Sequence, residues 1–294
     1  MEKELQDYLN YLLAEKKISK HTFVAYKADI EKFLAYLHEK SVDDWGKISK
    51  TFVIGYVLKL KEEGRASSTI LRNISAIRSF SDFLILKGIL KVDPTLGIDI
   101  PQGKKTDVEY LTIEEIELLL SQPDESMKGI RDRAILETLY GTGVKVSELI
   151  DLKVEDVNIR MKFITCSGDH GKPRIIPLGK MAAEALRKYM EEFRKKIVKG
   201  EDEHAFFLNL SGTGLSRQGL WKIIKKYAAE SNLGKEITPV TLRHSFGVHL
   251  VQNGADLKSV QELMGHSDIS TTQIYADIIK YRLKEVYDRT HPRA

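Results

Sequence analysis

The sequence has little cysteine and no long apolar run. Among its 294 residues the one cysteine, Cys166, can form neither an internal disulfide nor a cysteine-rich zinc site. No stretch approaches the roughly 18 consecutive apolar residues that a membrane-spanning helix needs. The first residues, MEKELQDYLN, are charged and amphipathic, unlike a secretory signal. We therefore expect a soluble, cytoplasmic protein that makes no use of a membrane.

The short motifs that hold nucleotides and metal ions are also missing. The sequence contains no GxxxxGK[ST] loop, no GxGxxG, no HExxH and no GxSxG. His244 and His249 lie five positions apart, which is a poor spacing for two metal ligands on one helix. We therefore expect neither a cofactor nor a metal ion.

The net charge of the chain says little about its binding partners. The chain has 46 Lys and Arg against 42 Asp and Glu, which leaves a net charge of +4 and a pI near 8.8. This balance permits DNA binding without requiring it, and an ordinary solvated surface would have the same composition.

Residues 1–91 have the apolar periodicity of amphipathic helices. Apolar side chains recur at three- and four-residue spacing in 2–15, in a segment that begins after Ser19, in 50–63 and in 66–87. Ser19 is a candidate N-cap, and Gly64 is suited to end the third helix. Four such helices predict a small bundle. Residues 92–107 lack the periodicity and contain two prolines and two glycines, which predicts a linker.

Residues 108–294 mix helices with a short strand region. Thr112, followed three positions later by Glu115, matches a capping box at the start of a helix. The apolar runs 163–166 and 174–178 flank a turn and predict a hairpin or a three-stranded sheet. Helices dominate afterwards, without the strand–helix alternation of Rossmann or TIM folds. We therefore expect a mainly α protein with a small antiparallel sheet, in the α+β class.

One stretch near the carboxyl end contains several residues capable of chemistry. It reads TPVTLRHSFGVHLVQNGADLKSVQELMGHSDISTTQIYA, from Thr238 to Ala276. Arg243 lies early in an apolar helix, His266 follows a second amphipathic helix, and Tyr275 comes nine positions later. Taken singly, each of these residues is more often structural than functional, so their combination carries the interpretation.

This combination closely resembles the C-terminal catalytic box of the tyrosine recombinases, or phage integrase family, and in particular the Xer-type site-specific recombinases. The resemblance continues in GTGVKVSEL (141–149), GDHGKPRIIPLG (168–179) and HTFVAYKADIEKFLAYL (21–37). It implies a helical, SAM-like core-binding domain at 1–91, a linker at 92–107, and a catalytic domain with a helical tail at 108–294. The implied function is site-specific DNA recombination, of the kind that resolves chromosome or plasmid dimers.

The resemblance also implies a chemistry and partners. A tyrosine hydroxyl attacks a DNA phosphodiester and forms a 3′-phosphotyrosyl link, so that religation needs neither nucleotide nor metal. Carried onto this sequence, the nucleophile is Tyr275, the second arginine Arg243 and the assisting histidine His266. The implied partner is double-stranded DNA, bound by a homo- or heterotetramer joined through the C-terminal tail, with no small-molecule substrate. Candidate DNA contacts are Lys20, Arg72, Arg78, Lys172 and Arg174.

Three positions depart from the family pattern. Lys145 stands where a first arginine is expected, Asp169 where the hairpin lysine is expected, and Val240 where a histidine is expected. Lysine keeps the charge of arginine without its planar fork, so Lys145 completes the predicted catalytic set in a weakened form. Two interpretations follow, a strand-cleaving recombinase or a DNA-binding relative with weak or lost cleavage. His244 could turn towards the phosphate, although packing within its helix is the simpler role.

Overall fold

The chain divides into two units, Met1–Thr106 and Asp107–Ala294. The structure is a computed structural model that describes residues 1–16, 18, 20–98, 108–167, 173–200, 203–266 and 268–278, without the side chains of Lys20 and His21. The division between the units falls within the stretch predicted as a linker. Each unit has its own apolar core and is described by itself.

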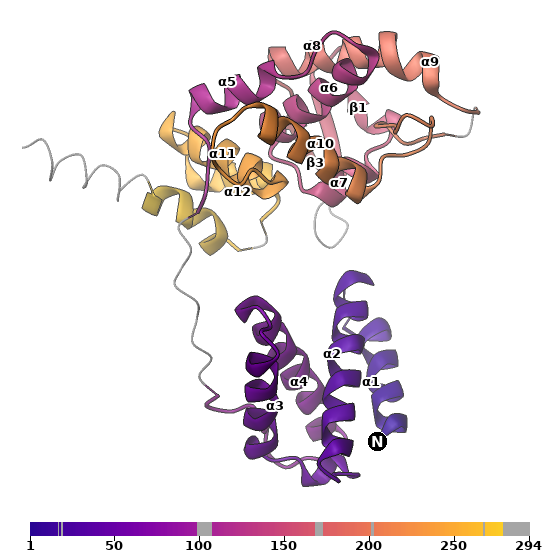
Figure 1. Cartoon of the computed structure of the whole chain (residues 1–294), viewed down its shortest axis with the longest axis vertical. Coiled ribbons are helices and arrows are strands. Elements are labelled where there is room, and N and C mark those ends of the chain that lie inside the picture. The colour runs from indigo at the N-terminus through magenta and orange to yellow at the C-terminus, as the bar shows by residue number, and fades with distance from the viewer. Residues whose placement is uncertain are drawn as a thin grey trace, which may run out of the picture. The chain divides into compact units, whose positions relative to one another are not determined.

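The first unit is a helical bundle (Figure 1). Its helices are α1 (Glu2–Ala14), α2 (Lys20–Glu39), α3 (Lys50–Glu62) and α4 (Ser67–Leu86), with a short 3-10 helix, η1 (Trp45–Lys47), before α3. In the core, the ring of Phe80 lies 4.7 Å from Trp45 and 4.9 Å from Tyr8, measured between centroids. The four predicted helices are confirmed, while the predicted N-cap Ser19 lies outside the described residues.

The second unit combines helices with a small sheet. The helices before and within the sheet region are α5 (Ile113–Ser121), α6 (Met127–Thr142), α7 (Val146–Asp151) and η2 (Val154–Asp156). The strands β1 (Val157–Asn158), β2 (Phe163–Ser167) and β3 (Pro173–Pro177) pair antiparallel in that order. The sheet is followed by α8 (Lys180–Lys188), the π-helical η4 (Tyr189–Arg194), α9 (Lys195–Ile197), α10 (Arg217–Glu230), α11 (Pro239–Gln252) and α12 (Leu257–Met264). Residues 270–278 are also helical.

These elements confirm the predicted fold class, mainly α with a small antiparallel sheet. The predicted capping box is present, since the backbone N–H of Glu115 donates to the Thr112 hydroxyl at 3.3 Å and the Glu115 carboxylate accepts from the Thr112 N–H at 2.8 Å. The expected tip of the hairpin, 168–172, lies outside the described residues. Within the described part of the chain, none of the helices has both the length and the apolar character to cross a membrane.

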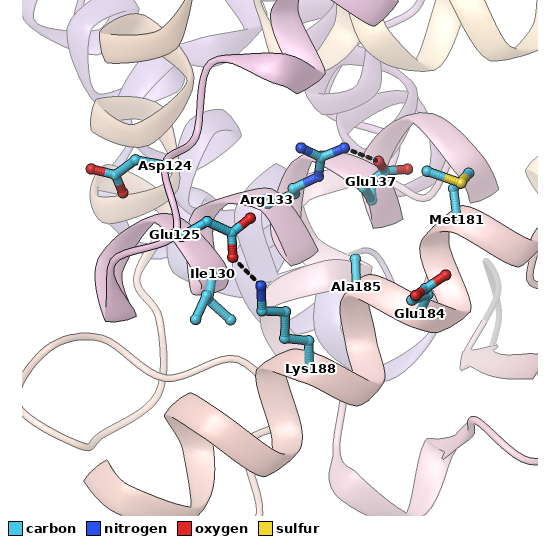
Figure 2. Close-up of a pocket in the computed structure, with 9 residues that line it drawn as sticks. All are labelled: Asp124, Glu125, Ile130, Arg133, Glu137, Met181, Glu184, Ala185 and Lys188. Carbon is cyan, nitrogen blue, oxygen red and sulfur yellow. Dashed lines mark hydrogen bonds and ion pairs between the residues drawn. The ribbon is translucent and has the colours of Figure 1, made fainter.

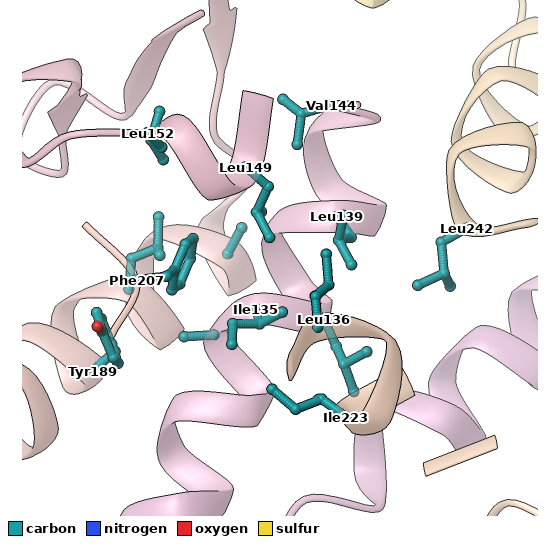
Figure 3. Packing of buried hydrophobic residues seen from close by; sticks show 14 of the residues in the cluster. Ile135, Leu136, Leu139, Val144, Leu149, Leu152, Tyr189, Phe207, Ile223 and Leu242 are labelled. Carbon is teal, nitrogen blue, oxygen red and sulfur yellow. The ribbon is translucent and has the colours of Figure 1, made fainter. Parts of the chain in front are cut away.

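Helix α6 lies at the centre of the second unit's core. Its residues Ile135, Leu136 and Leu139 are buried, and Figure 3 shows them among side chains from several other elements. Leu242 of α11 belongs to the same cluster. Because both helices are anchored in one core, the loop that leaves α6 at Gly143 keeps a fixed position relative to Arg243 on α11.

Candidate active site

A cavity of about 590 Å³ opens among the loop after α6, the helices α10 and α11, and the 265–275 region. The four predicted catalytic residues, Lys145, Arg243, His266 and Tyr275, all line it. The structure thus brings together side chains that are up to 130 positions apart in the sequence. The remaining lining residues are Val144, Val146, Ser147, Arg217, Trp221, Pro239, Val240, His244, Gly265 and Thr271.

Tyr275 is buried with its ring against α11. A Cβ atom at Gly247 would lie 2.5 Å from that ring, so the glycine leaves the space that the tyrosine fills. The Tyr275 hydroxyl lies 3.1 Å from Nδ1 of His244. Burial raises the pKa of Tyr275 to about 12, although the nearby Arg243 guanidinium acts in the opposite direction. The hydroxyl is therefore protonated at neutral pH and needs a proton acceptor to become a good nucleophile.

Arg243 connects the ends of two other helices. Its guanidinium donates to the backbone carbonyl of Gly143, just after α6, and to that of Met264, the last residue of α12. Gly143 adopts a left-handed backbone with φ +60°, and a Cβ there would lie 2.3 Å from the ring of Phe246. The tight turn after α6 therefore requires glycine, and it presents the carbonyl that helps to fix the plane of the guanidinium.

His266 follows α12 and its left-handed C-cap residue, Gly265. Its Nδ1 lies 2.9 Å from the Thr272 hydroxyl, and its backbone carbonyl accepts a hydrogen bond from the Gln261 amide at 3.1 Å. Burial, together with the neighbouring cations of Arg243 and Lys145, lowers the pKa of His266 to about 4. The ring is therefore neutral at pH 7 and can offer a hydrogen bond without a charge.

This buried neutral histidine predicts a loss of stability in acid. The unfolded chain takes up a proton near pH 6.5, the ordinary histidine value, whereas folded His266 does so only near pH 4. Its contribution is therefore complete above pH 6.5 and is lost as the pH falls towards 4. We expect the melting temperature to fall over this range, and to fall less steeply in His266→Gln. Equal slopes for the two proteins would contradict this origin of the acid sensitivity.

A buried ion pair lies behind the cavity. Both carboxylate oxygens of Glu148 on α7 accept from the guanidinium of Arg174 on β3, at 2.6 and 2.7 Å. The same carboxylate accepts from the backbone N–H of Lys145 at 2.8 Å, and Arg174 also donates to the carbonyl of Leu263 at 2.8 Å. The side chains of the pair are only 7% and 11% exposed. The pair therefore holds the loop that carries Lys145 close to the end of α12.

Removal of the Glu148 carboxylate should lower the stability of the protein. We expect Glu148→Ala to lower the free energy of unfolding by about 3–5 kcal/mol, because it removes the buried carboxylate that accepts two hydrogen bonds from the Arg174 guanidinium. The matched control is Glu191→Ala, which breaks an exposed ion pair with Arg187 and should cost at most about 1 kcal/mol. Urea unfolding followed by circular dichroism gives both values. Similar losses in the two variants would argue against the structural role of Glu148.

The predicted DNA contacts occupy different environments. Arg72 forms a two-point ion pair with the buried Asp29, at 2.7 and 3.0 Å. Arg78 donates to the Thr95 hydroxyl at 3.0 Å and is 54% exposed. Arg174 was expected to face DNA but lies inside its unit, where it holds Glu148. Lys172, Asp169 and the side chain of Lys20 lie outside the described residues. DNA contact by all five predicted residues stays a prediction.

A second cavity, of about 300 Å³, lies between α6 and α8 (Figure 2). Four of its charged groups form ion pairs, Lys188 with Glu125, and Arg133 with Glu137 at 3.7 Å. Burial raises the pKa of the Glu137 carboxyl. None of the predicted catalytic residues lines this cavity. We therefore place the candidate active site in the cavity around Tyr275.

Sequence reasoning did not find two parts of the site. Glu148 follows Lys145 by three positions, a spacing that brings its carboxylate back to the start of α7, and this signal was available in the sequence. The simpler role expected for His244 is packing within α11. That role does not explain why His244 contacts the Tyr275 hydroxyl. No local pattern indicates that contact, because it joins two helices 31 positions apart.

Comparisons with known proteins agree with the resemblance seen in the sequence. The phage integrase family model matches residues 109–281, and the model of the phage integrase N-terminal SAM-like domain matches residues 5–88. Tyrosine recombinase XerD of Oceanobacillus iheyensis is 43% identical over the full length of both chains. Tyrosine recombinase XerD of Listeria monocytogenes serotype 4b is 44% identical over 99% of each chain.

Solved structures share the fold at lower identity. The Tn1549 transposon integrase, in complex with a circular intermediate DNA, has a TM-score of 0.75 at 22% identity, over 92% of this chain and 94% of that one. A lambda integrase dimer bound to a core site has a TM-score of 0.73 at 18% identity, over 94% of each chain. The family matches and the full-length identity to curated relatives show that this chain belongs to the phage integrase family, as a Xer-type tyrosine recombinase.

Proposed function

We propose that this protein cleaves and rejoins double-stranded DNA at specific sites through a 3′-phosphotyrosyl intermediate on Tyr275. The observation that carries the proposal is the convergence of Tyr275, Arg243, His266 and Lys145 on one cavity. The full-length identity to proteins named tyrosine recombinase supports strand cleavage over the alternative, a DNA-binding relative without useful cleavage. The DNA present in the related Tn1549 and lambda integrase structures supports duplex DNA as the partner.

Each residue has a role that its chemistry allows. The Tyr275 oxygen forms a bond to phosphorus, the bond from phosphorus to the 5′-oxygen breaks, and that oxygen leaves as a hydroxyl after taking up a proton. Negative charge grows on the non-bridging oxygens, where the Arg243 guanidinium is suited to hold it. Lys145 adds a positive charge from the loop after α6, and the neutral His266 ring adds a hydrogen bond. The phosphotyrosyl bond conserves the energy needed for religation.

The cleavage step can be trapped directly. Duplexes that bind the protein are selected from a randomised pool, nicked close to the cleavage position and incubated with the protein. Because the short fragment beyond the nick diffuses away, religation fails and a covalent complex accumulates on a denaturing gel. Such a complex is the expected result. Salt-sensitive duplex binding without any covalent complex would instead support the DNA-binding alternative.

Lys145 should limit the rate. We expect Lys145→Arg to speed covalent complex formation by up to about 10²-fold, because a planar fork can donate two hydrogen bonds to one phosphate. The start of α7 depends on the backbone N–H of this residue, which the substitution keeps. The matched control is Lys153→Arg, at an exposed lysine outside the cavity. An unchanged or lower rate in Lys145→Arg would contradict the role given to this position.

The proposal extends to the biological setting. We propose that the protein acts in the cytoplasm on chromosome or plasmid dimers, as a homo- or heterotetramer assembled on DNA. The C-terminal tail that would join the subunits lies beyond residue 278, outside the described residues. Support for the tail comes from the apolar stripe of Ile278, Ile279, Leu283 and Val286 in the sequence, which is typical of a helix that docks on another surface.

A further inference from the structure

The Tyr275 hydroxyl has one hydrogen-bond partner in the described part of the chain, and that partner is a histidine. Nδ1 of His244 lies 3.1 Å from the phenolic oxygen. The two rings meet edge to face, with their centroids 5.8 Å apart and their planes at 65°. An imidazole nitrogen at this distance can accept the phenolic proton without any movement of either side chain.

The contact between His244 and Tyr275 follows from the helical periodicity of α11. Gly247 and His244 are three positions apart and so lie on one face of the helix, where the glycine leaves room for the tyrosine ring and the histidine reaches its hydroxyl. Val240, one turn earlier on the same face, also lines the cavity but carries no group that can bond to the hydroxyl. The polar contact to the nucleophile therefore rests on His244.

The second histidine of the cavity is engaged elsewhere. Nδ1 of His266 lies 2.9 Å from the Thr272 hydroxyl, and the centroid of its ring is 6.4 Å from that of Tyr275. His266 therefore keeps the role proposed for it above, whereas His244 contacts the nucleophile.

The His244 ring is in the form that accepts a proton. Burial, assisted by the adjacent Arg243 guanidinium, lowers the pKa of His244 below its usual 6.5, so the ring is neutral at neutral pH. Ionisable groups that line the same cavity are Lys145, Arg217, Arg243, His266 and Tyr275. The cations among them disfavour a charged imidazole, so a proton taken up by His244 is readily returned.

We propose that His244 is a catalytic residue that accepts the Tyr275 proton on Nδ1 as the phenolic oxygen bonds to phosphorus. The bond from phosphorus to the 5′-oxygen breaks in the same step, and the leaving oxygen takes a proton from solvent water. In religation the 5′-hydroxyl attacks phosphorus and releases its proton to water, while the tyrosine oxygen recovers its proton from His244. The assignment rests on the function proposed above and adds the base that activates the nucleophile.

The test compares two His244 variants on two nicked duplexes. One duplex has the natural phosphodiester, and the other has sulfur in place of the 5′-bridging oxygen, so that its leaving group needs no proton. We expect His244→Leu to slow covalent complex formation by about 10²- to 10⁴-fold on both duplexes, because the defect lies in the nucleophile. His244→Asn keeps a polar atom near the Nδ1 position without its basicity, and should preserve folding and duplex binding but not the rate.

The pH profile separates a base from a packed side chain. With the sulfur duplex, the wild-type rate should fall as the pH drops through the His244 pKa, below 6.5, and this inflection should be absent in His244→Asn. The matched control is His249→Asn. His249 lies on the same helix but outside the cavity, and its Nδ1 is 3.0 Å from the Tyr140 hydroxyl. The His249→Asn variant should keep both the wild-type cleavage rate and the inflection in its pH profile. Without DNA, the ring-carbon resonance of labelled Tyr275 should move in His244→Leu and stay in place in His249→Asn.

The outcomes distinguish this assignment from the function on which it rests. A wild-type protein that forms no covalent complex with either duplex refutes strand cleavage, and the assignment falls with it. A wild-type protein that cleaves, with a folded His244→Leu variant of equal rate, refutes the assignment alone. Rescue of His244→Leu by the sulfur duplex also refutes it, because that result would place His244 at the leaving group.

Discussion

Tyr275→Phe should abolish the covalent protein–DNA complex while leaving duplex binding intact. The substitution removes one oxygen atom, and that atom is the nucleophile, so we expect a loss of at least about 10⁴-fold in cleavage. The ring is fully buried against Gly247, and phenylalanine fills the same space. The lost hydrogen bond to His244 should cost about 1 kcal/mol of stability. Denaturing gels measure the complex, and a mobility-shift titration measures the binding.

A matched tyrosine controls for the lost hydrogen bond. The hydroxyl of Tyr140 lies 3.0 Å from Nδ1 of His249, which repeats the tyrosine–histidine contact outside the cavity. Tyr140→Phe should therefore have a similar effect on stability and none on cleavage. Persistent covalent complex in Tyr275→Phe would show that another residue is the nucleophile. A loss of duplex binding in Tyr275→Phe would instead point to a structural role for the hydroxyl.

Arg243→Ala should slow cleavage by about 10²- to 10³-fold, because the charge that grows on the phosphate loses its guanidinium partner. Arg243→Lys should recover little of this, because a single ammonium cannot reproduce the planar fork. Both variants also lose contacts to the carbonyls of Gly143 and Met264, so a lower melting temperature is expected as well. The rate is therefore measured in single-turnover experiments well below the melting temperature of each variant.

Arg194 provides the control for the loss of stability that follows when a guanidinium loses its contacts to backbone carbonyls. Its guanidinium also donates to backbone carbonyls, those of Glu203, Ala205 and Phe206, and it lies outside the cavity. Arg194→Lys should lower the melting temperature and leave the cleavage rate of the folded protein unchanged. Wild-type cleavage by Arg243→Lys would contradict the view that the guanidinium geometry matters at position 243.

Local signals in the sequence predicted the elements well and selected candidate catalytic side chains that line one cavity. The helix starting after Thr112 follows from its capping box, and the helices of the first unit follow from apolar periodicity, since both depend on residues a few positions apart. The motif around Arg243, His266 and Tyr275 located three side chains that the structure places on one cavity. Short-range physics and a family motif were sufficient for these features.

Side-chain contacts between residues far apart in the sequence could not be predicted in the same way. Arg72 and Arg174 were predicted as DNA contacts, yet each forms a two-point pair with a buried carboxylate, Asp29 and Glu148 respectively. These partners are 43 and 26 positions away, so no local spacing indicates them. The contact of His244 with Tyr275 is hidden for the same reason. Tertiary packing decides which charges are paired inside the protein and which face solvent.

Mass spectrometry of the trapped complex tests the central claim most directly. The covalent complex on a nicked duplex is digested with nuclease and protease, and the peptide that retains a nucleotide is sequenced. We predict that the 3′-phosphate is attached to the tyrosine of ISTTQIY, Tyr275. Attachment to Tyr281, Tyr287 or any other side chain would contradict the site described above.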